Sequence, residues 1–156
     1  ATIGYGFMEA YASFVRPFSD AERDRFYAEA EPSARLFGAV GAPLSLAAQK
    51  ALFEATRPAL EPHPIVHEFM KLMSTTQLLP SPLRPLQSTL LRAAVSILPD
   101  WLSDLLALRT TWQLAPWERK LLSSLGALAD RIPIVNAPPA QACRRLGLSA
   151  NYLYRR

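Results

Sequence analysis

The stretch TIGYGFMEAYASFVR, residues 2–16, decides what kind of fold this chain can adopt. Apolar residues recur at the i, i+4, i+7, i+11 spacing of one helix face, at Ile3, Phe7, Ala10 and Phe14. The neighbouring face is also free of charge and carries Gly4, Met8, Tyr11 and Val15. A helix that is apolar on more than one side is normally buried. Residues 2–16 are therefore predicted to form an internal helix that other helices cover.

The helical period continues along most of the chain. Ser19 and Glu22 have the spacing of a capping box, which predicts a helix from about residue 20 that Pro32 breaks or restarts. Ser45 is a second candidate N-cap. Further helices are predicted at about 45–57, 64–79, 86–97, 101–108 and 117–132. No stretch alternates apolar and polar residues, so no sheet is expected. The 14 prolines mostly separate these segments, which favours many short helices packed at angles.

Composition limits the class of protein further. The 156 residues suffice for one domain, and half of them are hydrophobic, which argues against disorder. No apolar run approaches the roughly 20 residues that span a bilayer. Cys143 is the only cysteine, so no internal disulfide can form. This fits a reducing compartment, and we expect a cytoplasmic protein with Cys143 as an inert packing residue.

Charge is unevenly distributed. The net charge is +4, but all 13 acidic residues precede residue 131, and the segment 131–156 contains arginines without acids. A protein that holds nucleic acid across a whole face needs bases along that face. In this chain only the segment 131–156 could bind nucleic acid through its positive charge, so nucleic acid is not the expected partner.

The tail AQACRRLGLSANYLYRR, residues 140–156, has the order of a helix-turn-helix. Gly147 would make the turn, Ser149 would cap the second helix, and Asn151, Tyr152 and Arg155 would face outward. The short second helix and the prolines before the tail argue against a complete DNA-binding domain. We interpret residues 137–156 as a basic C-terminal helix pair and keep a transcription regulator as an alternative.

Two histidines could suggest a metal site. His63 and His67 have the i, i+4 spacing that lets two imidazoles share one metal. His63 lies between two prolines, where the helix has barely begun, and no third ligand is nearby in sequence. We therefore predict no metal ligand here and interpret both as partly exposed residues. The carboxylates offer no catalytic pair, so the catalytic residues stay unknown.

Three motifs in order resemble a known family. They lie in the segments 1–31, 41–45 and 79–108, and their matching residues are Tyr11, Phe14, Val15, Pro17, Phe18, Ser19, Glu22, Pro43, Ser45, Leu98, Pro99, Trp101 and Leu102. In this order and spacing the chain resembles the C-terminal portion of the MpaB-like / latex-clearing rubber oxygenase catalytic-domain family.

The resemblance implies an all-helical fold of about seven or eight short helices with globin-like, orthogonal packing. It also implies a b-type haem for oxygen chemistry on an apolar small-molecule or polymer substrate, polyisoprenoid or prenylated. The family's axial His and its distal Arg and Thr lie upstream of the matched segment and are not among residues 1–156. Gly4 would let the flat ring approach closely, and Tyr5, Phe7 and Met8 would line it, so we predict these four as cofactor-binding residues.

Three hypotheses follow. In the first, residues 1–156 are the C-terminal part of a larger haem-oxygenase-like domain, completed by a further N-terminal segment or by homo-oligomers. In the second, they form a single, catalytically silent helical domain that acts as an interaction module. The third is the transcription regulator. It is disfavoured because residues 1–130 carry almost no net charge, with 13 acidic and 12 basic residues. Whether the chain is itself an oxidoreductase stays open at this point.

Overall fold

The structure is a computed structural model that describes residues 2–132 and 137–154. Its elements are α1 (Thr2–Phe14), α2 (Asp20–Leu36), α3 (Leu46–Thr56), η1 (Arg57–Ala59), α4 (Ile65–Thr75), η2 (Ser81–Leu83), α5 (Arg84–Ser96), α6 (Asp100–Leu105), α7 (Pro116–Ala129), α8 (Pro138–Arg145) and η3 (Tyr152–Tyr154). Across the described ranges there are eight α-helices, three 3₁₀ turns and no strand. The all-helical class and the number of helices are confirmed. The globin-like packing stays a prediction.

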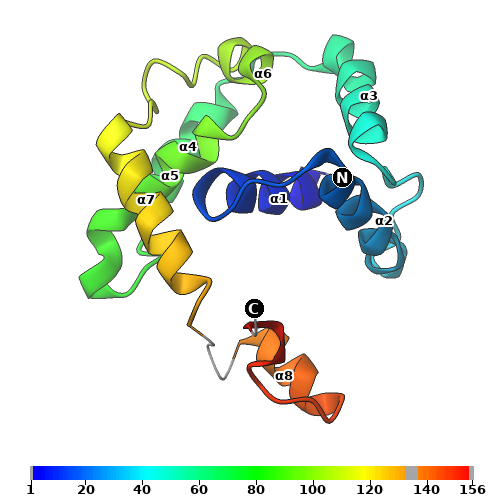
Figure 1. Cartoon of the computed structure of the whole chain (residues 1–156). Helices are drawn as coiled ribbons and strands as arrows, with labels where there is room; N and C mark the ends of the chain where they lie inside the picture. The colour runs from blue at the N-terminus through cyan, green and yellow to red at the C-terminus, as the bar shows by residue number, and fades with distance from the viewer. Residues whose placement is uncertain (1, 133–136, 155–156) are drawn as a thin grey trace.

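Helix α1 lies in the middle of the arrangement (Figure 1). It packs against α7 and α5 on one side and against α2 on the other, and α2 in turn packs against α3. Met8 is buried, and the Tyr5 hydroxyl donates a hydrogen bond to the Ile97 carbonyl at 3.0 Å. The prediction of an internal helix is only partly right, because Ile3 and Phe7 keep 75% and 72% of their surface exposed.

Helix α2 begins with the predicted capping box. The Glu22 amide donates to Ser19 Oγ at 3.3 Å, and the Ser19 amide donates to Glu22 Oε2 at 2.9 Å. The prediction that Pro32 breaks this helix is wrong, since α2 continues to Leu36. An ion pair between Glu31 and Arg35, 2.6 Å apart, spans the position of Pro32 and supports the turn that follows it.

A compact apolar cluster joins α4, α5 and the segment after α6. Met70, Val95 and Leu108 are its buried members. Beside it, the buried Gln87 side chain donates to the carbonyls of Met73 and Thr76, at 2.7 and 2.6 Å. These bonds hold the end of α4 against α5, which itself packs against α1.

The described tail consists of α8 and the 3₁₀ turn η3, which pack against each other. Gly147 has a positive φ of 72°, as a turn after α8 requires. Cys143 is buried in α8. Where the sequence predicts a second tail helix, the described residues form only η3, and Arg155 lies outside them. Within the described ranges no helix has the length and apolar character needed to cross a membrane.

Candidate functional site: an apolar cleft along α1

An apolar cleft of about 570 Å³ lies between α1, α5 and α7. Its lining residues are Phe7, Ala10, Tyr11, Phe14, Val15, Leu86, Leu90, Ala93, Ala94, Ile97, Leu122, Leu125, Gly126 and Ala129. Among the described residues that line it, Tyr11 is the one with a polar side-chain group. A cavity of this size and character suits an apolar group the size of a small organic molecule.

A close helix contact sets the width of the cleft at one end. A Cβ built on Gly126 of α7 would lie 2.5 Å from the Phe14 carbonyl oxygen and 3.1 Å from Val15 Cγ2. Only glycine permits this approach, because real Cβ atoms do not come so near a backbone atom. The absence of a side chain at Gly126 therefore positions α1 on α7.

A buried ionic network ties the other two walls together. Glu118, near the start of α7, forms an ion pair with Arg92 of α5 and accepts a hydrogen bond from Thr89 Oγ1 at 2.9 Å. It also accepts from the Ala115 amide at 3.0 Å, which caps α7. The hydrogen bond from Arg92 is the main reason that the pKa of Glu118 falls to about 2. The carboxylate is thus charged at neutral pH and holds α5 and α7 in register.

The side chain of Tyr11 is held by contacts of its hydroxyl and of its ring. Its hydroxyl donates to Asp130 Oδ1 at 2.7 Å, and its ring stacks on Phe18 with centroids 5.2 Å apart and planes 9° apart. The guanidinium of Arg16 covers the same Phe18 ring at 5.0 Å. Tyr11 is therefore held as a wall of the cleft by its neighbours on both sides.

The cleft is open to solvent. Leu90 and Leu125 line it from opposite walls and keep 45% and 41% of their surface exposed. Phe7, which also lines the cleft, is exposed as well. An apolar surface of this kind is left uncovered where a ligand or another chain belongs.

The four predicted cofactor-binding residues do not share one cavity. Phe7 lines the apolar cleft, while Gly4 and Phe7 also border a further cavity of about 410 Å³ formed mainly with α2. Tyr5 lines a separate polar pocket, and Met8 is buried in packing. Their role in binding a cofactor stays a prediction.

Both histidines lie away from the cleft. His63 and His67 are exposed, and His63 Nδ1 accepts a hydrogen bond from the Ile65 amide at 3.1 Å, at the start of α4. The part of the chain that the structure describes contains no group of three His, Cys, Asp or Glu residues able to hold a metal. The described lining of the cleft likewise contains no imidazole or thiolate.

The walls on α5 and α7 were missed as site residues by the sequence reasoning. Leu90, Ala94 and Leu125 belong to stripes that the sequence marks only as helix faces. The available signal was the presence of small residues, Ala93, Ala94 and Gly126, within the predicted helices 86–97 and 117–132. Small residues facing a large apolar helix leave space that side chains do not fill.

The described residues thus form an all-helical structure with an open apolar cleft between α1, α5 and α7. The family model described as "ER-bound oxygenase mpaB/B'/Rubber oxygenase, catalytic domain" matches residues 1–131, and the chain belongs to this family. The resemblance indicated by the three motifs is thereby confirmed. Comparison with curated proteins and with solved structures gave no match to this chain.

Proposed function

We propose that this chain forms the apolar wall of an oxygenase site, with a b-type haem bound in the cleft between α1, α5 and α7. The observation that carries the proposal is the open, almost wholly apolar cleft in a chain of an oxygenase family. Burial of the apolar macrocycle contributes much of the free energy that holds a haem. When bound, the haem would supply the activation of dioxygen.

The cleft residues fit one part of the haem and not the other. Leu90, Ala94 and Leu125 would cover the ring and exclude water from it. The described lining offers no histidine for the iron, so the proposal takes the axial ligand from outside residues 1–156. A further N-terminal segment would supply it, and that segment or a second copy would cover the exposed side chain of Phe7. The substrate would be apolar, a polyisoprenoid or prenylated chain, which the same apolar walls would accept.

A second candidate function is a catalytically silent interaction module. The absence of an imidazole from the described lining of the cleft favours it, since an apolar groove without a metal ligand can instead take a partner helix. For either function we propose a cytoplasmic location, which the single cysteine supports.

Titration of haemin into the full chain, with imidazole added as an external axial ligand, tests the proposal. The expected result is a saturable Soret shift that persists through gel filtration. Leu90→Glu places a charge on the cleft wall at a residue that is already 45% exposed, so the fold should persist and haem binding should fall about tenfold or more.

Leu72→Glu is the matched control, because Leu72 is an exposed leucine of α4 outside the cleft. It should bind haem like the parent. A parent chain that takes up no haem with imidazole present, or equal loss in both variants, would contradict the haem proposal and leave the interaction module as the better account.

A further inference from the structure

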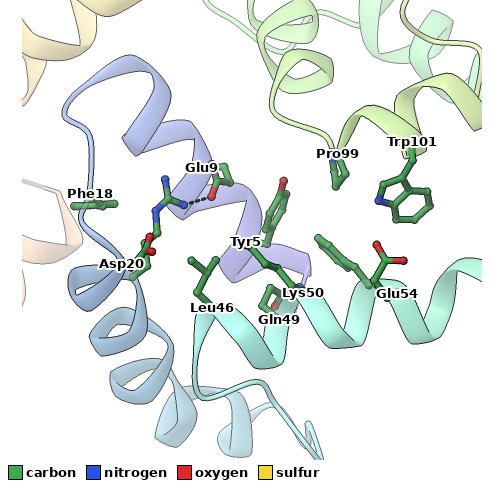
Figure 2. Close-up of a pocket in the computed structure, with 12 residues that line it drawn as sticks. Tyr5, Glu9, Phe18, Asp20, Leu46, Gln49, Lys50, Glu54, Pro99 and Trp101 are labelled. Atoms are coloured by element: carbon green, nitrogen blue, oxygen red, sulfur yellow. Dashed lines mark hydrogen bonds and ion pairs between the residues drawn. The ribbon is translucent and has the colours of Figure 1, made fainter.

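The polar pocket lined by Tyr5 is a cavity of about 450 Å³ on another face of α1, between α1, α2, α3 and the start of α6 (Figure 2). Its character differs from that of the cleft. Aromatic side chains from three parts of the chain, Tyr5, Phe53 and Trp101, share it with charged and amide groups. Nothing in the haem proposal uses this polar pocket.

Gln49 of α3 lies on the floor of the polar pocket and is only 1% exposed. Neither its Oε1 nor its Nε2 has a hydrogen-bond partner within residues 2–132 and 137–154. The hydroxyl of the buried Tyr27 is in the same situation. Buried amides are normally paired, because leaving them unpaired costs their hydration.

The other buried glutamine of the chain shows the contrast. Gln87 has both ends of its amide satisfied, by the Met73 and Thr76 carbonyls and by the Leu78 amide at 3.3 Å. The unpaired amide of Gln49 is therefore a property of this position and not of every buried glutamine. It marks a place where a polar group from outside the chain would be accepted.

The neighbours of Gln49 are already engaged with each other. Glu9 forms an ion pair with Arg23, as the dashed line in Figure 2 shows, and the Tyr5 hydroxyl is bonded to the Ile97 carbonyl. Burial, followed by the nearby charge of Glu9, raises the pKa of Tyr5 to about 12, so this hydroxyl stays neutral. These groups leave the two ends of the Gln49 amide for a ligand.

The shape and charge of the polar pocket limit the ligand further. The Tyr5 and Phe53 rings meet edge to face, with centroids 4.8 Å apart and planes 74° apart, so a flat molecule that stacks on one ring meets the other at a steep angle. Three carboxylates and two cations line the polar pocket: Glu9, Asp20, Glu54, Arg23 and Lys50. This balance disfavours an anion. A group that presents one donor and one acceptor side by side complements a glutamine amide at both ends.

We propose that the polar pocket binds a small, neutral, planar carboxamide, whose amide pairs with that of Gln49 and whose flat body lies against Tyr5 and Phe53. Pairing requires the buried Gln49 side chain to turn toward the cavity. An amide without partners gives up no hydrogen bond when it turns.

Titration of benzamide into the full chain, followed by calorimetry and by saturation-transfer NMR, tests this inference. The parent should bind benzamide saturably, and Gln49→Leu should bind it about tenfold more weakly or worse. Gln77→Leu, at an exposed glutamine outside the polar pocket, should bind like the parent. Benzoate, which has the same shape and a negative charge, should bind at least about tenfold more weakly than benzamide.

Thermal melting separates loss of binding from loss of fold. Gln49→Leu removes an unpaired buried amide, so without ligand it should melt at or above the temperature of the parent. No saturable benzamide binding by the parent, equal binding by Gln49→Leu, equal binding of benzoate, or a lower melting temperature of Gln49→Leu would each overturn the inference. Leu90→Glu should leave benzamide binding unchanged, so the haem proposal and this one fail independently.

Discussion

Gly126 of α7 lies directly against the backbone of Phe14 of α1: a Cβ on Gly126 would lie 2.5 Å from the Phe14 carbonyl oxygen. The atom that would be struck belongs to the backbone, which cannot rotate away as a side chain can. The two helices must therefore separate if position 126 carries any side chain.

Gly126→Ala should accordingly destabilise the protein by about 1–3 kcal/mol, the usual cost of overpacking. Gly6→Ala is the matched control, because a Cβ on Gly6 in the interior of α1 meets nothing within 4 Å. That change should be neutral or stabilising by up to about 1 kcal/mol. Urea unfolding followed by circular dichroism measures both, and equal effects of the two variants would contradict the assigned contact.

The Glu118–Arg92 pair supports a second prediction. Glu118→Ala leaves the Arg92 charge without its partner and removes the acceptor for Thr89 and for the Ala115 amide. The expected loss is about 2–4 kcal/mol of unfolding free energy. Glu54→Ala breaks an exposed pair with Arg57, 3.7 Å long, and should cost at most about 1 kcal/mol. Similar losses would mean that Glu118 does not brace α5 and α7.

Low pH should weaken the same Glu118 network, because protonation removes the charge of its carboxylate. The folded state lowers the pKa of Glu118 from 4.5 to about 2, so its contribution is complete above pH 4.5 and is lost as the pH falls toward 2. Unfolding free energies measured between pH 6 and pH 2 should decline less steeply for Glu118→Gln than for the parent. Some decline should persist, because the pKa of Glu22 is also lowered to about 2, chiefly by hydrogen bonding to the Ser19 amide. Parallel pH profiles would refute the role of Glu118.

Pro32 provides a test inside α2. An internal proline lacks the amide that would complete the helical ladder. Pro32→Ala should therefore raise the unfolding free energy by about 1–3 kcal/mol. Pro116 occupies the first turn of α7, where a proline amide is not missed, so Pro116→Ala should not stabilise. Stabilisation by Pro116→Ala and not by Pro32→Ala would contradict the assignment of Pro32 as the proline that weakens its helix.

Local signals in the sequence were sufficient for much of the fold. Ser19 and Ser45 act as N-caps as predicted, since a cap depends on residues three positions away. The prediction that Pro32 breaks α2 is wrong because the proline removes one hydrogen bond, while the other hydrogen bonds and contacts of the 17-residue helix remain. The family was indicated by the order and spacing of three motifs along the chain. Helix periodicity and capping residues alone do not identify a family.

The candidate sites were harder to predict. Leu90 and Leu125 look the same in sequence whether they fill a core or line a cleft, because the difference lies in what covers them. Gln49 looks like an ordinary surface residue of a helix, and only the packing of α1 and α2 over α3 buries it. Both features depend on contacts between distant segments.

Helix α1 borders the apolar cleft through Phe14, the polar pocket through Tyr5, and the cavity beside α2 through Gly4. Most of its positions border one of these cavities, so most substitutions in α1 change the shape of a cavity. Among related chains, this short segment should diverge more slowly than the helices that surround it.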